Sequence, residues 1–222
     1  MDVRLNSSHS LRNHALHRSR SWAVSRMDCQ LSRSGDGHRY AAMAGIMIRR
    51  ESEEVAKRAI ILNCVVAASF GYPRDAIVEW LKSEGIWSSA TKWKAAYLQS
   101  ETPPDEDNIT ANQTAEAAAT LSWSLGLIDA LPDPSQPTDL DLVIDSLPQI
   151  QAPTSEFLGS ATLRPRAEIA KFNETIYNNH WAVRDALIND REIPDNHHPV
   201  VVHQRHLASN WLCPKLIGGV AW

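Results

Sequence analysis

The sequence contains few of the residues on which several classes of protein depend. The three cysteines, Cys29, Cys64 and Cys213, are too few and too scattered to form a disulfide framework. Cys64 lies in an apolar run, which is typical of a small buried side chain. Nine glycines in 222 residues leave little material for the glycine-rich loops that bind nucleotide phosphates. These shortages argue against a disulfide-stabilised scaffold and against a nucleotide-binding enzyme.

Long hydrophobic runs are also missing. The longest apolar stretch, around residues 59–68, is interrupted by Asn63 and is far shorter than the ~20 residues that a transmembrane helix requires. No apolar segment of the secretory type lies near the N-terminus. We therefore expect a cytoplasmic protein that does not associate with a membrane.

Charge is distributed unevenly along the chain. Residues 1–50 contain nine arginines, no lysine and three acids, a net charge of +6, although the whole chain has a net charge of -4. The remaining residues therefore carry a net charge of -10. An acidic domain argues against nucleic-acid binding, because the neutralisation of phosphates requires clustered lysines and arginines.

Residues 1–48 are rich in serine, arginine and histidine and show no sustained apolar period. We interpret them as a disordered basic leader, or as an N-terminal extension that results from a wrongly chosen start codon. A transit peptide and a basic interaction arm are the alternatives.

Residues 49–222 show the periodicity of a single helical domain. Apolar residues recur at helical spacing from about Ser52, a predicted N-cap, to Phe70. A second helix is expected after Pro73 with Gly85 as its C-cap, and a third after Ser88 or Ser89.

The middle of the domain is less regular. Two prolines and four acids in residues 100–108 predict a solvated loop. Residues 110–113 match the capping-box pattern and predict the start of an alanine-rich helix. Thr138 is expected to cap a short helix with Ile144 facing inward, and residues 148–160 are expected to be irregular.

The last third is the most strongly patterned. Pro165 is suited to the first turn of a helix, and a stripe of apolar residues from Ile169 to Leu187 extends that helix to about Asn189. A short loop then leads to a final helix. The predicted fold class is all-α: an irregular multi-helix domain with a C-terminal antiparallel helix pair.

A series of motifs runs in order along these segments: RRES at 49–52, the segment 73–80, GIW at 85–87, WSLGLIDALP at 123–132, LRP at 163–165, HWAVRDA at 180–186 and RHLASNWL at 205–212. Together they resemble a bacterial family known as a domain of unknown function, number 4272 in that series. The resemblance covers residues 49–222 and does not indicate a particular activity, because none is assigned to the family.

The C-terminal helix pair contains the best candidates for a catalytic or ligand-binding site. Antiparallel packing of the two helices would bring their polar side chains together, so that arginine could bind an anion and histidine could transfer a proton. The alternative is that these residues are satisfied polar groups that fix the register of the helices. The catalytic candidates are His180, Arg184, Asp185, Arg205 and His206, and the ligand-binding candidates are Tyr177 and Asn210.

A metal site is a weaker hypothesis. His203 and His206 are three residues apart on a helix and could share a metal ion, with His197 and His198 nearby. No HExxH motif and no cysteine pair at zinc spacing accompany them. We predict no cofactor.

Three functions therefore remain open. The first is a non-enzymatic accessory or immunity-type protein that binds a protein partner. The second is an enzyme or small-ligand-binding domain that uses the His/Arg/Asp cluster. The third is a metal-dependent hydrolase. The acidic domain and the lack of catalytic motifs favour the first.

Overall fold

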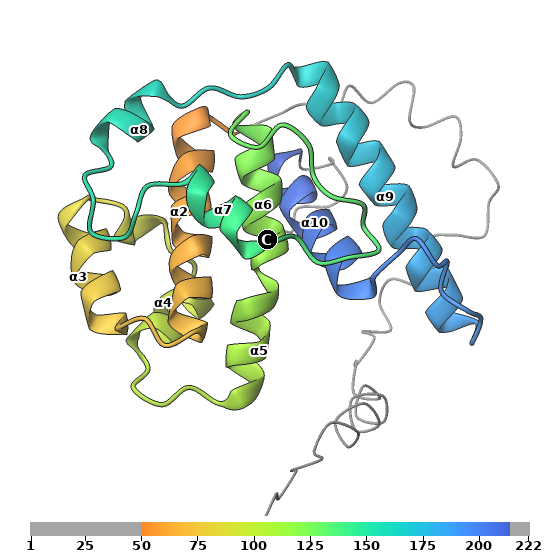
Figure 1. The fold of residues 1–222 in the computed structure, drawn as a ribbon, viewed down its shortest axis with the longest axis horizontal. Helices are drawn as coiled ribbons and strands as arrows, with labels where there is room; N and C mark the ends of the chain where they lie inside the picture. The colour runs from red at the N-terminus through yellow and green to blue at the C-terminus, as the bar shows by residue number, and fades with distance from the viewer. Residues whose placement is uncertain (1–49, 214–222) are drawn as a thin grey trace, which may run out of the picture. The chain divides into compact units, whose positions relative to one another are not determined.

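The helix α2 (Ser52–Ser69) forms the centre of the domain in the computed structural model, which describes residues 50–213 (Figure 1). Every residue from Ala59 to Val66 is buried, so no face of this part of the helix is left for water. The prediction that Ser52 is the N-cap is wrong, because Glu51 occupies that position and makes no capping hydrogen bond through its side chain. Glu53 and Glu54 instead stabilise the positive end of the helix dipole.

Three short elements pack against one side of α2: α3 (Arg74–Ser83), the 3-10 turn η2 (Trp87–Ser89) and α4 (Lys92–Gln99). Glu84 is the C-cap of α3, one residue before the predicted Gly85, whose φ of 70° is a conformation that glycine adopts without strain. Ser88 and Ser89 belong to η2, and Thr91 is the residue that precedes α4. The core on this side includes Ile61, Val65, Ile77, Leu81, Tyr97 and Leu98.

The predicted loop at residues 100–108 is wrong in its second half, where α5 (Asp105–Gln113) begins. Pro104 precedes the helix and three acids occupy its first turn, where the helix dipole favours negative charge. The capping-box prediction is also wrong, since the Thr110 hydroxyl lies inside the helix and donates to the carbonyl of Glu106 at 2.8 Å. A break at Thr114 separates α5 from α6 (Ala115–Ser124), which is buried along its whole length.

Two short helices follow α6 in the chain, of which the first packs on α6 and the second on α2. Asp139, and not Thr138 as predicted, caps α7 (Leu140–Ser146) by accepting a hydrogen bond from the backbone N–H of Asp141 at 3.1 Å. The segment predicted to be irregular contains α8 (Ser155–Ser160). Immediately before α8, the backbone N–H and the hydroxyl of Thr154 both donate to Glu84, the C-cap of α3, at 2.8 and 2.7 Å.

The C-terminal pair consists of α9 (Arg166–Ile188) and α10 (Pro199–Leu212), which pack side by side (Figure 1). The predicted apolar stripe of α9 ends one turn early, because Leu187 is 60% exposed whereas Val183 is buried. Helix α10 also packs on α6, so α6 lies between α10 and the central α2.

The all-α fold class is confirmed, since residues 50–213 contain no strand. These residues belong to one compact unit, Ile46–Trp222. No helix in this part of the chain has the length and apolar character needed to cross a membrane. The leader predicted for residues 1–48 lies outside the described residues.

A buried ion pair joins α6 to α10. Arg205 is 2% exposed and Glu116 is 4% exposed, and the guanidinium Nε lies 3.0 Å from Glu116 Oε2. Arg205 also donates to the carbonyl of Pro132 at 2.7 Å and to the hydroxyl of Thr138 at 3.1 Å. The backbone N–H and hydroxyl of Thr138 donate in turn to the Glu116 carboxylate. The network therefore satisfies both buried charges, which makes their burial tolerable.

We expect Glu116→Gln to lower the free energy of unfolding by about 3–5 kcal/mol, because it leaves the Arg205 charge buried without its counter-ion. Urea denaturation followed by circular dichroism measures the change. The control is Asp185→Asn, which breaks an ion pair with Arg191 whose side chains are 57% and 59% exposed. That substitution should cost less than about 1 kcal/mol. Equal losses in the two variants would contradict a special role for the buried pair.

Candidate functional site

The packing of α9 on α10 brings three histidines into one cluster. The rings of His180 on α9 and His206 on α10 are stacked, with centroids 4.0 Å apart and planes inclined by 3°. The ring of His203, one turn earlier on α10, lies 5.9 Å from that of His180. The structure thus places His180 beside His206, as antiparallel packing of the two helices predicts.

Aromatic and polar side chains surround this histidine cluster. The Tyr177 ring lies 6.0 Å from His206, and the Trp181 ring lies 6.1 Å from His180. Arg184 places its guanidinium carbon 5.4 Å from the centre of the Trp181 ring, within cation–π range. Asn210 Nδ2 lies 2.8 Å from His206 Nε2. An amide Nδ2 can only donate, so Nε2 of His206 accepts this hydrogen bond.

Burial lowers the pKa of His180 to about 4, and the positive charges of His203 and Arg184 act in the same direction. The pKa of His203 is lowered by burial and by Arg184. His180 is therefore neutral at pH 7 and cannot bind an anion by its charge. A base with a pKa near 4 is also poorly matched to proton transfer at neutral pH. The arrangement favours a packing role for the His180 ring.

Two of the predicted catalytic residues lie apart from the histidine cluster. Arg205 donates hydrogen bonds to Glu116, Pro132 and Thr138, on the side of α10 that faces α6. Asp185 is exposed and pairs with Asn189 and Arg191 at the end of α9. The structure therefore brings together His180, His206, Tyr177 and Asn210, with Arg184 at the edge, and it separates Arg205 and Asp185 from them.

The two-histidine metal site has no third ligand in the described part of the chain. Between residues 50 and 213, no three His, Cys, Asp or Glu side chains are grouped so that they could hold a metal ion. The other two histidines of the predicted group lie in the loop before α10. His197 Nδ1 lies 2.7 Å from Asn196 Oδ1, and the backbone N–H of His198 donates to the carbonyl of Pro134 at 2.7 Å.

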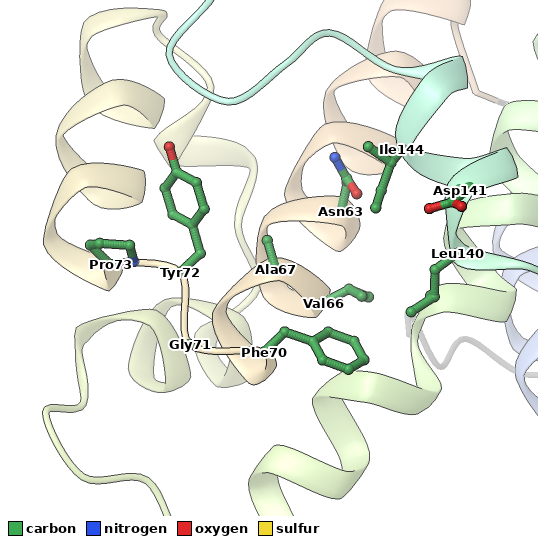
Figure 2. A pocket seen from close by; sticks show the side chains of 10 residues that line it. All are labelled: Asn63, Val66, Ala67, Phe70, Gly71, Tyr72, Pro73, Leu140, Asp141 and Ile144. Carbon is green, nitrogen blue, oxygen red and sulfur yellow. The ribbon is translucent and has the colours of Figure 1, made fainter.

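A groove that the sequence did not predict lies between the C-terminal end of α2 and α7 (Figure 2). It has a volume of about 550 Å³, and we call it the α2–α7 groove. Phe70, 63% exposed, and Ile144, 48% exposed, stand at this surface. The groove is lined by Asn63, Val66, Ala67, Phe70, Gly71, Tyr72, Pro73, Leu140, Asp141 and Ile144.

The sequence contains two signals for this groove. Phe70 directly precedes Gly71, whose φ of 91° ends the helix and turns the chain away from the core. A helix as short as α7 buries only one face, and Val143 and Leu147 occupy that face. Ile144, which was predicted to face inward, is therefore left at the surface.

The lowered histidine pKa values predict that the domain loses stability in acid. Between pH 6.5, the ordinary pKa of histidine, and about 4, the unfolded chain binds a proton at His180 that the folded chain does not bind. Stability should therefore fall as the pH falls through this range, by at most about 3 kcal/mol for this residue.

The measurement is chemical denaturation of wild type and His180→Gln at several pH values between 7 and 4. The difference between the two proteins cancels the carboxylates, which titrate in both. We expect the variant to lose less stability than wild type over this interval, because glutamine takes up no proton. Parallel pH curves would contradict the inferred neutrality of His180.

Comparisons with known proteins identify a family. Residues 43–217 match the family model described as a domain of unknown function, DUF4272. No curated protein and no solved structure matches the chain. The match spans most of the 222 residues and includes every helix described above. This chain, with α6 and α10 tied to each other by a buried ion pair, belongs to the DUF4272 family.

Proposed function

We propose that this domain is a non-enzymatic interaction protein that binds a partner protein through the α2–α7 groove. The observation that carries the proposal is the exposure of large apolar side chains within a concave surface, with Phe70 and Ile144 at its edge. Leu142, on the same short helix, is 37% exposed. Apolar side chains gathered at a hollow are typical of grooves that receive an apolar segment of another protein.

The charge around the groove indicates the chemistry of the partner. Asp141 lines the groove, and Asp139 and Asp145 are exposed on or beside α7. No lysine or arginine lines the groove or belongs to α7. A segment with apolar anchors flanked by lysine or arginine complements this surface, so we infer that the partner presents a basic amphipathic helix.

The enzyme and ligand-binding alternative has weaker support. This alternative requires Arg205 and Asp185 to lie beside His180. Arg205 instead donates a hydrogen bond to Glu116 on α6, and Asp185 accepts one from Asn189 at the end of α9. The pKa of His180, about 4, also places it far from the range suited to proton transfer at neutral pH. These observations favour a structural role for the cluster and leave the α2–α7 groove as the better candidate for function.

The test uses two synthetic helical peptides of equal length, one built from leucine and lysine and the other from leucine and glutamate at the same spacing. Fluorescence anisotropy measures their binding to the purified protein. We expect the lysine peptide to bind and the glutamate peptide not to bind. Phe70→Asp and Ile144→Asp should each weaken binding of the lysine peptide by about tenfold or more, because a buried apolar contact is replaced by a desolvated charge.

Leu187→Asp is the matched control, since Leu187 is a comparably exposed apolar residue, 60%, at the far end of α9. This variant should bind the lysine peptide as tightly as wild type. A photoreactive amino acid at position 70, compared with position 187, would then identify the natural partner in cells. Equal binding of both peptides, or equal losses in all three variants, would contradict the proposal.

A further inference from the structure

Asn63 is a buried amide in the middle of α2. The residue is 7% exposed, and the other residues from Ala59 to Val66 are buried and apolar. Within residues 50–213, no side chain or backbone group forms a hydrogen bond with its amide. Asparagine is a poor helix former, and a buried amide without a hydrogen bond costs folding free energy. The described fold therefore gives no structural reason for an amide at this position.

The other buried asparagine of the described chain shows the contrast. Asn173 on α9 is fully buried, and its Nδ2 donates to the hydroxyl of Ser209 on α10 at 2.6 Å. This hydrogen bond joins two helices, so a role in stabilising the fold explains Asn173. Asn63 makes no such bond to any described helix.

The Asn63 amide instead faces the α2–α7 groove. Asn63, Val66 and Phe70 share one face of α2, since three and four positions separate them in turn, and all three line the groove. Figure 2 shows the amide beside the Ile144 side chain of α7. Phe70 is 63% exposed whereas Asn63 is 7% exposed, so the amide lies at the floor of the groove and Phe70 at its edge.

A purely apolar segment would be a poor occupant of this floor. It would displace water from the Asn63 amide and replace it with nothing, and an unpaired buried donor or acceptor weakens binding. A bound helix cannot offer its backbone, because its N–H and C=O groups already bond to each other. The complement must therefore be a side chain with both a donor and an acceptor. Glutamine fits this requirement, because two amides can exchange two hydrogen bonds and glutamine is a good helix former.

We propose that Asn63 selects a glutamine side chain on the bound helix, so that the partner presents one amide among its apolar anchors. This inference rests on the proposed function of the α2–α7 groove. Asn63 and Phe70 lie about two turns apart along α2, or ~10 Å, so a helix lying along α2 meets them with residues about seven positions apart. The amide pair fixes the register of the partner, as a single buried asparagine fixes the register of a coiled coil.

The test uses the leucine–lysine peptide as the parent and a set of peptides in which one leucine at a time is replaced by glutamine. Fluorescence anisotropy measures their binding to wild type and to Asn63→Leu, which removes the amide. We expect one glutamine peptide to bind wild type at least about fivefold more tightly than the parent, because an amide pair replaces an unpaired amide. With Asn63→Leu the order should reverse, because the glutamine is then buried without a partner.

Asn178→Leu is the matched control, because it makes the same change at an exposed position of α9. It should keep the preference of wild type. The inference is overturned, and the groove proposal left standing, if the parent binds through Phe70 and Ile144 but no glutamine peptide is preferred, or if Asn63→Leu keeps the preference. If neither the parent nor any glutamine peptide binds, both proposals are overturned.

A second measurement needs no peptide. Asn63→Leu should melt no lower than wild type, because it removes an amide that the described fold leaves without a hydrogen bond. Asn173→Leu should melt at a lower temperature, because it loses the hydrogen bond to Ser209. Equal decreases in the two variants would show that the Asn63 amide serves the fold, and would overturn the inference.

Discussion

The position of α10 depends on one buried guanidinium group. Arg205 meets the carboxylate of Glu116 on α6 and the carbonyl of Pro132 and hydroxyl of Thr138 in the connection that follows α6. A residue this deeply buried can keep its charge only where several acceptors converge on it. The arginine therefore fixes three segments at once: the last helix, the helix beneath it and the chain that leads from that helix to α7.

The orientation of Arg205 also determines what the rest of α10 faces. Successive residues of a helix point about 100° apart, so when Arg205 faces α6, His206 must face another neighbour. That neighbour is α9, where His206 stacks on His180. One turn further on, the hydroxyl of Ser209 accepts a hydrogen bond from the buried amide of Asn173 at 2.6 Å. The histidine cluster thus follows from the register that the ion pair imposes, and its stacked rings suit a packed interface.

Local signals allowed part of this fold to be predicted. Pro73, Gly85 and Pro165 restrict the backbone by themselves, and the helix boundaries beside them were predicted within a residue or two. The start of α5 was missed because an acidic first turn resembles a solvated loop. Its helical state also depends on distant partners, since Asn108 accepts hydrogen bonds from Tyr97 at 2.8 Å and from Arg74 at 3.2 Å.

The candidate site was harder to predict because its side chains also depend on partners that are distant in the sequence. Arg205 and His206 are adjacent in the sequence, and their chemistry suggested a shared role, but helical geometry separates their side chains. The partner of Arg205 is 89 residues away, in a helix otherwise composed largely of small apolar residues. A single acid within the alanine-rich run of α6 was the one hint, because a charge in so apolar a helix requires a buried partner.

The two most deeply buried basic residues of the described chain, Arg205 and Lys94, differ in how the fold balances their charges. Both are less than a tenth exposed. Arg205 has a carboxylate, a carbonyl and a hydroxyl around it, so its charge is balanced by the fold itself. Lys94 has one long hydrogen bond and a positively charged neighbour, so the described fold does not balance its charge. Removing the partner of Arg205 leaves a buried charge that cannot be given up, whereas Lys94 can lose its proton at a lower cost, because its pKa is lowered to about 8. The fold therefore depends more strongly on the balanced charge of Arg205 than on the charge of Lys94.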